Sequence, residues 1–138
     1  MASAYDKPLP IASNPTLTKP FWEATQKEEL LVPRCNTCSV LFFYPREVCP
    51  KCLSMDLGWQ KASGLGKVHS YTKVKQAAHP SFQSADGHIY AIIQLNEGMK
   101  IPSNIVGIDA DDVKIDMDVI AVFEKVTDEV TLVKFKPL

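Results

Sequence analysis

The 138-residue sequence has no surplus of charge of either sign and no long hydrophobic run. Fifteen lysines and arginines stand against sixteen aspartates and glutamates, and the isoelectric point is about 6.3. No apolar stretch approaches the roughly 18 residues of a membrane span. The first residues also lack the basic and apolar regions of a secretory signal peptide. We therefore predict a cytoplasmic protein.

Cysteine is scarce as well, and no cysteine stands outside two Cys-x-x-Cys pairs. The first pair is Cys35 and Cys38, and the second, after ten intervening residues, is Cys49 and Cys52. A tight turn over two residues brings both sulfurs of a pair to one side of the backbone, and two such turns on a hairpin supply a tetrahedral Zn²⁺ site. Because four sulfur ligands leave no position for water, we predict a structural zinc ion rather than a catalytic one.

Other uses of four cysteines fit this sequence less well. A redox-active Cys-x-x-Cys usually occurs once, at a strand-to-helix junction, and structural disulfides would imply secretion. An iron centre of the rubredoxin type uses the same four thiolates, so iron stays possible beside zinc.

The N-terminal stretch, residues 1–17, lacks a periodic apolar face and carries Pro8, Pro10 and Pro15. We expect an extended arm. Such an arm either lies across a surface, of this chain or of a partner, or is a frayed terminus.

A helix is expected over residues 18–30. Thr18 is suited to its N-cap, and Pro20 is tolerated in a first helical turn. Phe21 and Trp22 are its largest apolar side chains. They either pack on the rest of the chain or contact a partner protein, because such residues are enriched at the cores of interfaces.

The cysteines lie among three short apolar runs, at residues 31–34, 40–45 and 57–62. These predict a three-stranded, rubredoxin-like zinc ribbon. A unit of about 30 residues cannot bury a core of its own. Bound zinc, worth on the order of 10–16 kcal/mol in apparent binding free energy, would supply the missing stability.

The second half of the chain reads as short strands. Polar and apolar residues alternate over residues 67–75, which places Val68, Ser70, Thr72 and Val74 on one face of a half-buried strand. Further strands are expected at residues 89–95, 100–107, 119–124 and 130–135. We predict a mainly β chain whose barrel is a five-stranded antiparallel OB fold. The expected divisions are an arm and docking helix (1–30), a zinc ribbon (31–62) and the barrel (63–138).

A series of short motifs follows in a fixed order along the whole chain. They are Phe21-Trp22-Glu23-Ala24, Leu30, Arg34-Cys35-x-x-Cys38, Phe43-x-Pro45-Arg46, Cys49-Pro50-x-Cys52, Trp59, Ser63-Gly64-x-Gly66-x-Val68-x-Ser70-Tyr71-Thr72, Leu95-x-Glu97-Gly98, Val119 and Phe135-x-Pro137. In this combination the sequence resembles the DUF35 family of OB-fold proteins associated with acyl-CoA enzymes, over about 120 residues. Ser39 and Asp116 depart from the pattern, since the family often has glycine at both positions.

The resemblance implies a non-catalytic, zinc-containing accessory subunit of a thiolase-fold enzyme complex. Such a complex makes or breaks a C–C bond in an acyl-CoA thioester, and the implied assembly is a hetero-oligomer with the acyl-CoA at or near the interface. The residues agree with a subunit role, because His69, His79 and His88 have no acidic partner at a recognisable spacing. A free-standing enzyme is the rival interpretation.

A surface that binds coenzyme A needs cations for its phosphates and an apolar groove for the remainder. Lys73, Lys75 and Lys100 are candidates for the cationic end, and Phe82 and Tyr90 for the groove. The alternative is that these lysines only keep the outer face of the barrel in water.

The main alternative function is binding of single-stranded nucleic acid, for which OB barrels and zinc ribbons are both used. Such proteins usually carry a basic stripe. Here the near-neutral charge and the acidic connector over residues 109–118 argue against it.

Overall fold

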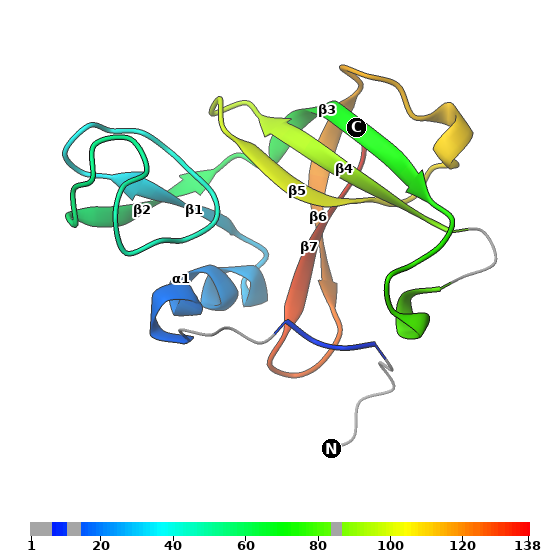
Figure 1. Ribbon diagram of the computed structural model, residues 1–138, viewed down its shortest axis with the longest axis horizontal. Helices are drawn as coiled ribbons and strands as arrows, with labels where there is room; N and C mark the ends of the chain where they lie inside the picture. The colour runs from blue at the N-terminus through cyan, green and yellow to red at the C-terminus, as the bar shows by residue number, and fades with distance from the viewer. Residues whose placement is uncertain (1–6, 11–14, 84–86) are drawn as a thin grey trace.

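The computed structural model describes residues 7–10, 15–83 and 87–138, and within them it shows an N-terminal helix, a two-stranded ribbon and a closed barrel (Figure 1). The elements are α1 (Pro15–Gln26), β1 (Leu30–Cys35), β2 (Leu57–Ala62), β3 (Leu65–Val74), β4 (His88–Leu95), β5 (Lys100–Ile105), β6 (Asp118–Lys125) and β7 (Thr131–Pro137), with 3₁₀ turns at Pro80–Phe82 and Ala110–Asp112. No helix in the part of the chain that the structure describes has the length and apolar character of a membrane span.

The helix is shifted toward the N-terminus relative to the prediction. It begins at Pro15, whose fixed φ and missing N–H suit a first helical position. It ends at Gln26 because Glu28 adopts a left-handed backbone with φ 57°. Thr18 therefore lies inside the helix and is not its N-cap. Most of the predicted arm, at residues 1–6 and 11–14, lies outside the described residues.

The ribbon has two full strands where three were predicted. β1 and β2 pair antiparallel from Leu30 with Ala62 to Cys35 with Leu57. The run at residues 40–45 contributes only one bridge, between Arg34 and Leu41. Beyond it the chain leaves β1, because its aromatic side chains pack elsewhere: the ring centroid of Phe43 lies 5.7 Å from that of Phe21.

The five-stranded barrel is confirmed, with strand order β3-β4-β5-β7-β6 and closure of β6 onto β3. One pairing corrects the prediction of a purely antiparallel barrel, because β5 runs parallel to β7 through Ile105 and Phe135. The chain crosses the end of the barrel between β5 and β6. β7 returns antiparallel to β6 and so reaches β5 in the parallel sense.

A bulge in β3 changes which side chains face inward. Val68 pairs with Ile93, whereas Ser70 pairs with Ile92, so His69 is the extra residue. Before the bulge the predicted face is correct, since Val68 is fully buried. After it the alternation reverses: Ser70 and Thr72 are exposed, and Tyr71 packs against the core. The prediction for Ser70 and Thr72 was wrong because a strict period of two cannot anticipate an inserted residue.

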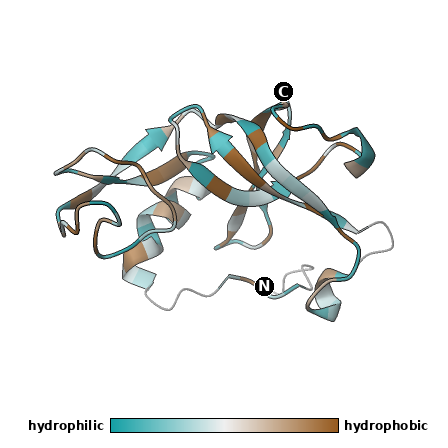
Figure 2. Cartoon of the chain, turned by 45° about the horizontal axis from the view of Figure 1, so that its top comes forward, coloured by the Kyte–Doolittle hydropathy of each residue, from teal (hydrophilic) through white to brown (hydrophobic). Residues whose placement is uncertain are grey.

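One hydrophobic core joins the ribbon to the barrel. Leu30, Val32 and Ala62 from the ribbon lie in the same buried cluster as Ile93 and Phe135 from the barrel. Figure 2 shows hydrophobic segments recurring along the strands on either side of this junction. α1 packs against both β1 and β7. The helix, the ribbon and the barrel are therefore held in a fixed arrangement.

Candidate functional site

A four-cysteine metal centre lies at the end of the ribbon, as the sequence predicted. The sulfurs of Cys35, Cys38, Cys49 and Cys52 all lie within 4.8 Å of one another. The distances between Sγ atoms are 3.6 Å for Cys35 and Cys52 and 3.7 Å for Cys38 and Cys49. Tetrahedral zinc with Zn–S bonds of about 2.3 Å needs S–S edges of about 3.8 Å. The four cysteines are therefore positioned to bind one metal ion.

Backbone N–H groups around the centre point at the sulfurs. Cys35 Sγ accepts a bond from the N–H of Cys38 at 3.4 Å, and Cys49 Sγ accepts from Lys51 and Cys52 at 3.3 and 3.4 Å. These bonds form because each Cys-x-x-Cys stretch folds into a tight turn. Hydrogen bonds to a sulfur stabilise its thiolate form, which is the form that binds metal.

The thiols differ in how readily they ionise. The N–H of Cys38 is the main group that lowers the pKa of Cys35, to about 6. Burial opposes ionisation of Cys49, but the N–H groups of Cys52 and Lys51 outweigh it and lower the pKa of that thiol. Cys52 receives the N–H of Ser54, yet burial and its bonds with the other three thiols raise its pKa to about 12. Without metal, the cluster therefore cannot hold four thiolates at neutral pH.

Polar side chains fasten the two cysteine turns to each other and to β1. Thr37 and Ser54 share a hydroxyl hydrogen bond at 2.8 Å, and Asn36 Nδ2 donates to Asp56 at 3.1 Å. Arg34 donates to Ser39 Oγ at 3.2 Å. The guanidinium thus lies beside the first turn, where its charge can offset the surplus negative charge of a metal bound by four thiolates.

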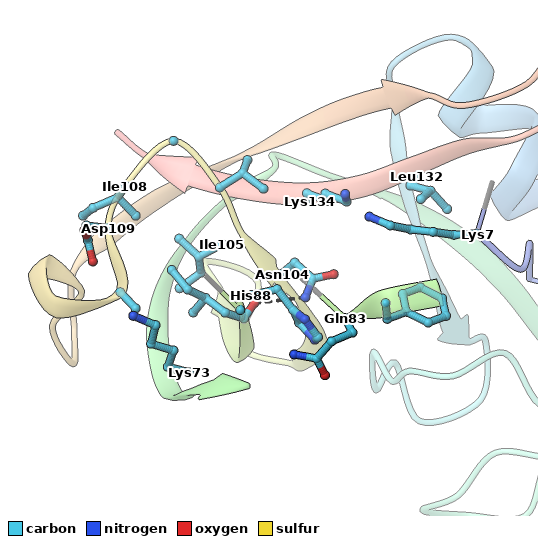
Figure 3. Close-up of a pocket in the computed structure, with 16 residues that line it drawn as sticks. Lys7, Lys73, Gln83, His88, Asn104, Ile105, Ile108, Asp109, Leu132 and Lys134 are labelled. Atoms are coloured by element: carbon cyan, nitrogen blue, oxygen red, sulfur yellow. Dashed lines mark hydrogen bonds between the residues drawn. The ribbon is translucent and has the colours of Figure 1, made fainter. Parts of the chain in front are cut away.

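A second feature is a pair of adjoining cavities on the barrel. The first, of about 590 Å³, lies over the ends of β4 and β5 and has Lys7, Lys73 and Lys134 in its lining (Figure 3). The second, of about 630 Å³, lies between α1, the segment after the first cysteine turn, and strands β5 and β7. Four residues line both cavities: Phe82, Asn104, Leu132 and Lys134.

The second cavity is mostly aromatic and proline-rich in its lining. Its aromatic members are Phe21, Trp22, Phe43, Tyr44, Phe82 and Tyr90, and its prolines are Pro8, Pro10, Pro45 and Pro102. We call it the aromatic groove. Three of these rings remain strongly exposed to solvent, with Tyr44 at 58%, Tyr90 at 45% and Phe82 at 38%. Exposed apolar surface of this kind typically marks a binding site.

Of the five residues predicted to bind coenzyme A, three line the two cavities and two do not. Lys73 lines the first cavity, Tyr90 the aromatic groove, and Phe82 both. Lys75 and Lys100 line neither of these cavities, although both are exposed. Lys73 reaches the cavity because the bulge at His69 places it on the same face as Tyr71.

Sequence reasoning missed two cations of the first cavity, Lys7 and Lys134. Lys7 lies in the arm, where no periodicity indicates a position. Lys134 lies in an apolar strand, and its ammonium pairs with Glu124 on β6 at 2.5 Å. Lys134 and Lys136 alternate with apolar residues in this strand, a pattern that indicates the outer face of the barrel and not a cavity.

Phe21 and Trp22, predicted as packing or partner residues, form an edge-to-face pair with centroids 5.0 Å apart. Phe21 packs against the shared core, which supports the packing interpretation. Both side chains also line the aromatic groove. Contact of Trp22 with a partner stays a prediction.

Two family models match consecutive parts of the chain. Residues 22–58 match the family model described as the ChsH2 rubredoxin-like zinc ribbon domain, and residues 59–124 match the ChsH2 C-terminal OB-fold domain. A DUF35 domain-containing scaffold protein of Methanocaldococcus jannaschii is 37% identical, over 79% of this chain and 82% of its own length.

A longer relative and a solved structure are also similar. A probable enoyl-CoA hydratase alpha subunit of Thermomonospora curvata is 33% identical over 95% of this chain, which spans only 41% of that relative. A solved chain described as the Ltp2-ChsH2(DUF35) aldolase is 31% identical, with a TM-score of 0.80, over 92% of this chain and 98% of that chain. With its zinc-ribbon residues, its OB barrel and these relatives, the chain belongs to the DUF35 family.

Proposed function

We propose that this protein is a zinc-containing accessory subunit of a thiolase-fold enzyme complex that acts on acyl-CoA thioesters. The observation that carries the proposal is the similarity, along almost the whole of both chains, to the DUF35 chain of the Ltp2-ChsH2 aldolase. The similar scaffold protein and the hydratase subunit also carry names of complex components. In this proposal the partner supplies the nucleophile and bases, and the complex makes or breaks a C–C bond in the cytoplasm.

The proposed metal is zinc, held by Cys35, Cys38, Cys49 and Cys52. The Sγ–Sγ distances of 3.6 and 3.7 Å match a tetrahedral site closed by four sulfurs. When bound, zinc would supply structural cross-linking of the ribbon and no chemistry, since no ligand position is left for substrate. In this proposal the described residues of the arm and helix (1–30), of the ribbon (31–62) and of the barrel (63–138) form one platform for the partner.

The aromatic groove supports the proposal of a partner or ligand on this face. Its exposed rings come from three parts of the chain: Tyr44 from the ribbon, Tyr90 from β4 and Phe82 from the loop after β3. Aromatic side chains are enriched in the buried cores of interfaces. A face built from the ribbon and the barrel together depends on their fixed arrangement, which is a reason for such a subunit to carry a structural metal.

Purification of the tagged full-length chain from its native host tests the function. We expect a thiolase-fold protein in stoichiometric amount by mass spectrometry, and zinc in the purified complex by elemental analysis. The reconstituted complex should turn over an acyl-CoA thioester, and the partner alone should be slower. A chain that stays monomeric beside the thiolase-fold proteins of its host, or that turns over acyl-CoA alone, contradicts the proposal.

A further inference from the structure

We infer that Cys52 is a site of oxidation by hydrogen peroxide, and that its reaction converts the four-cysteine centre into a form with a Cys35–Cys52 disulfide that no longer holds the metal. The inference rests on the zinc of the proposed function. It adds to that function a chemical reaction by which this chain can lose its structural metal.

The four thiols differ in how far solvent reaches them. Cys35 and Cys49 are fully buried, Cys38 is half-buried and Cys52 is exposed. Leu53, the next residue, is 74% exposed. In Figure 1 the loops between β1 and β2 lie at the end of the ribbon that points away from the barrel. A dissolved oxidant therefore reaches Cys52 first, because oxidation of cysteine follows exposure and thiolate character.

Thiolate character does not distinguish the four sulfurs once metal is bound. A coordinating thiol is deprotonated outright, so all four are thiolates in the loaded centre. Hydrogen bonding favours the same sulfur as exposure does. Cys49 Sγ accepts the N–H groups of Lys51 and Cys52, whereas Cys52 Sγ accepts that of Ser54. An N–H that stabilises a thiolate also makes it a weaker nucleophile, which protects Cys49 more than Cys52.

A second thiol lies within reach of the exposed one. Cys35 Sγ is 3.6 Å from Cys52 Sγ. The sulfurs of a disulfide are about 2.05 Å apart, so these two need to approach by only about 1.6 Å. Cys38 and Cys49 form a similar contact at 3.7 Å, but neither thiol of that pair is exposed. The contact between Cys35 and Cys52 is therefore the one that combines an accessible sulfur with a near partner.

The reaction proceeds in two steps. The Cys52 thiolate attacks one oxygen of the peroxide, and the O–O bond breaks to leave a sulfenic acid on Cys52 and one hydroxide ion. The Cys35 thiolate then attacks the Cys52 sulfur, so that an S–S bond forms, the S–O bond breaks and a second hydroxide leaves. Two thiolates together lose two electrons, and the peroxide gains them. Cys38 and Cys49 alone then remain as ligands, and two sulfurs do not close a tetrahedral site.

Treatment of the zinc-loaded, full-length chain with hydrogen peroxide tests the inference. Zinc release is followed with a chromogenic chelator, and the products are mapped by mass spectrometry after trypsin digestion. Cleavage after Arg46 and Lys51 places Cys49 and Cys52 on different peptides. We expect dimedone to trap a sulfenic acid on Cys52 first. Peptide 52–61 should then be joined to peptide 35–46 through Cys35, in step with zinc release, and dithiothreitol with added zinc should restore the centre.

Two histidine variants form a matched pair for this test. Cys52→His keeps a possible zinc ligand, since three cysteines and one histidine also make structural sites, but removes the accessible sulfur. It should release zinc at least about fivefold more slowly than wild type at the same peroxide concentration. Cys38→His makes the same exchange in the first turn and should stay within about twofold of wild type.

Three outcomes would overturn the inference: trapping on Cys38 before Cys52, a disulfide between peptides 47–51 and 52–61, or equal protection by the two histidine variants. If Cys52→His does not fold with zinc, the peptide map of the wild-type chain decides. A chain that binds no zinc contradicts the proposed metal together with this inference. A zinc-bound chain that keeps its metal in peroxide contradicts this inference alone.

Discussion

Ser39 and Leu53 occupy equivalent positions in the two cysteine turns. Each directly follows the second cysteine of its pair, with φ of 66° and 65°. Each donates its backbone N–H to the carbonyl oxygen of the first cysteine of its pair, at 2.9 Å to Cys35 and 3.0 Å to Cys49. The two turns are thus built alike, and each requires a left-handed backbone that suits glycine better than serine or leucine.

Leu53→Gly should stabilise the metal-bound protein by about 1 kcal/mol, because a side chain in the left-handed region costs about that much. The Leu53 side chain is 74% exposed, so little packing is lost. Equilibrium urea unfolding of the zinc-loaded protein measures the change.

Ser39→Gly is the matched control for that substitution. It relieves the same backbone strain but removes the hydroxyl that accepts from Arg34 at 3.2 Å. Its gain should therefore be smaller than that of Leu53→Gly. Destabilisation by Leu53→Gly would show that its side chain contributes contacts which outweigh the strain.

Removal of the metal should unfold the ribbon before the barrel. The ribbon is held by few strand pairs, and the metal contributes on the order of 10 kcal/mol to its folding. After chelation, hydrogen exchange should show lost protection over residues 30–62 and retained protection in β4, which serves as the internal control. The same pattern is expected for Cys35→Ser or Cys49→Ser. A ribbon that keeps its protection without metal would refute the structural role.

Zinc affinity should fall as the pH is lowered. The pKa of Cys52 is raised to about 12, so at neutral pH metal must displace a proton from this thiol. Cys35, with a pKa of about 6, is already ionised at pH 7 and protonates only as the pH falls through 6, where the loss should steepen. Competition with a chelator between pH 5 and 8 measures this, and proton release on binding is read from calorimetry in two buffers. An affinity independent of pH would contradict the assignment of thiol ligands.

Gly66→Ala should destabilise the barrel by roughly 1–3 kcal/mol, because the added methyl group overpacks a closed contact. A Cβ at this position would lie 2.6 Å from the carbonyl oxygen of Gln94 and 3.0 Å from Ile93 Cγ2. Thermal unfolding compares it with Ser70→Ala, an exposed position on the same strand, for which little change is expected. Equal stability of both variants would show that β3 and β4 can separate at Gly66 without cost.

The parts of the fold that follow from local chemistry were predictable from the sequence. The spacing of the cysteines predicted the metal centre, and alternating residues predicted the strands of the barrel. Ser39 and Asp116, noted as departures from family glycines, both have φ of 66°. The bulge at His69 and the parallel pairing of β5 with β7 were not predictable, because both depend on how distant segments meet.

The lining of the two cavities was predicted only in part, for a similar reason. Phe82, Tyr90 and Lys73 were identified because large apolar or charged side chains stand out in loops and strands. Lys7 and Lys134 are separated by most of the chain, and only the closed barrel and the docked arm bring them to one cavity. Lys75 is two residues from Lys73 but does not line the cavity; β3 ends at Val74, so Lys75 lies in the loop that follows the strand.

The bulge at His69 divides β3 into two halves with different surroundings. Before it, β3 is bonded on both sides, to β6 through Leu65–Lys67 partners and to β4, and its inward residues serve folding. After it, β3 pairs with β4, Tyr71 packs against the core, and Lys73 lines the first cavity. Ser70, Tyr71 and Thr72 belong to the family pattern, so we expect variation after the bulge to concentrate at Lys73. A related subunit can thus change the charge of the first cavity at this position without altering the pairing of β3 with β6 that closes the barrel.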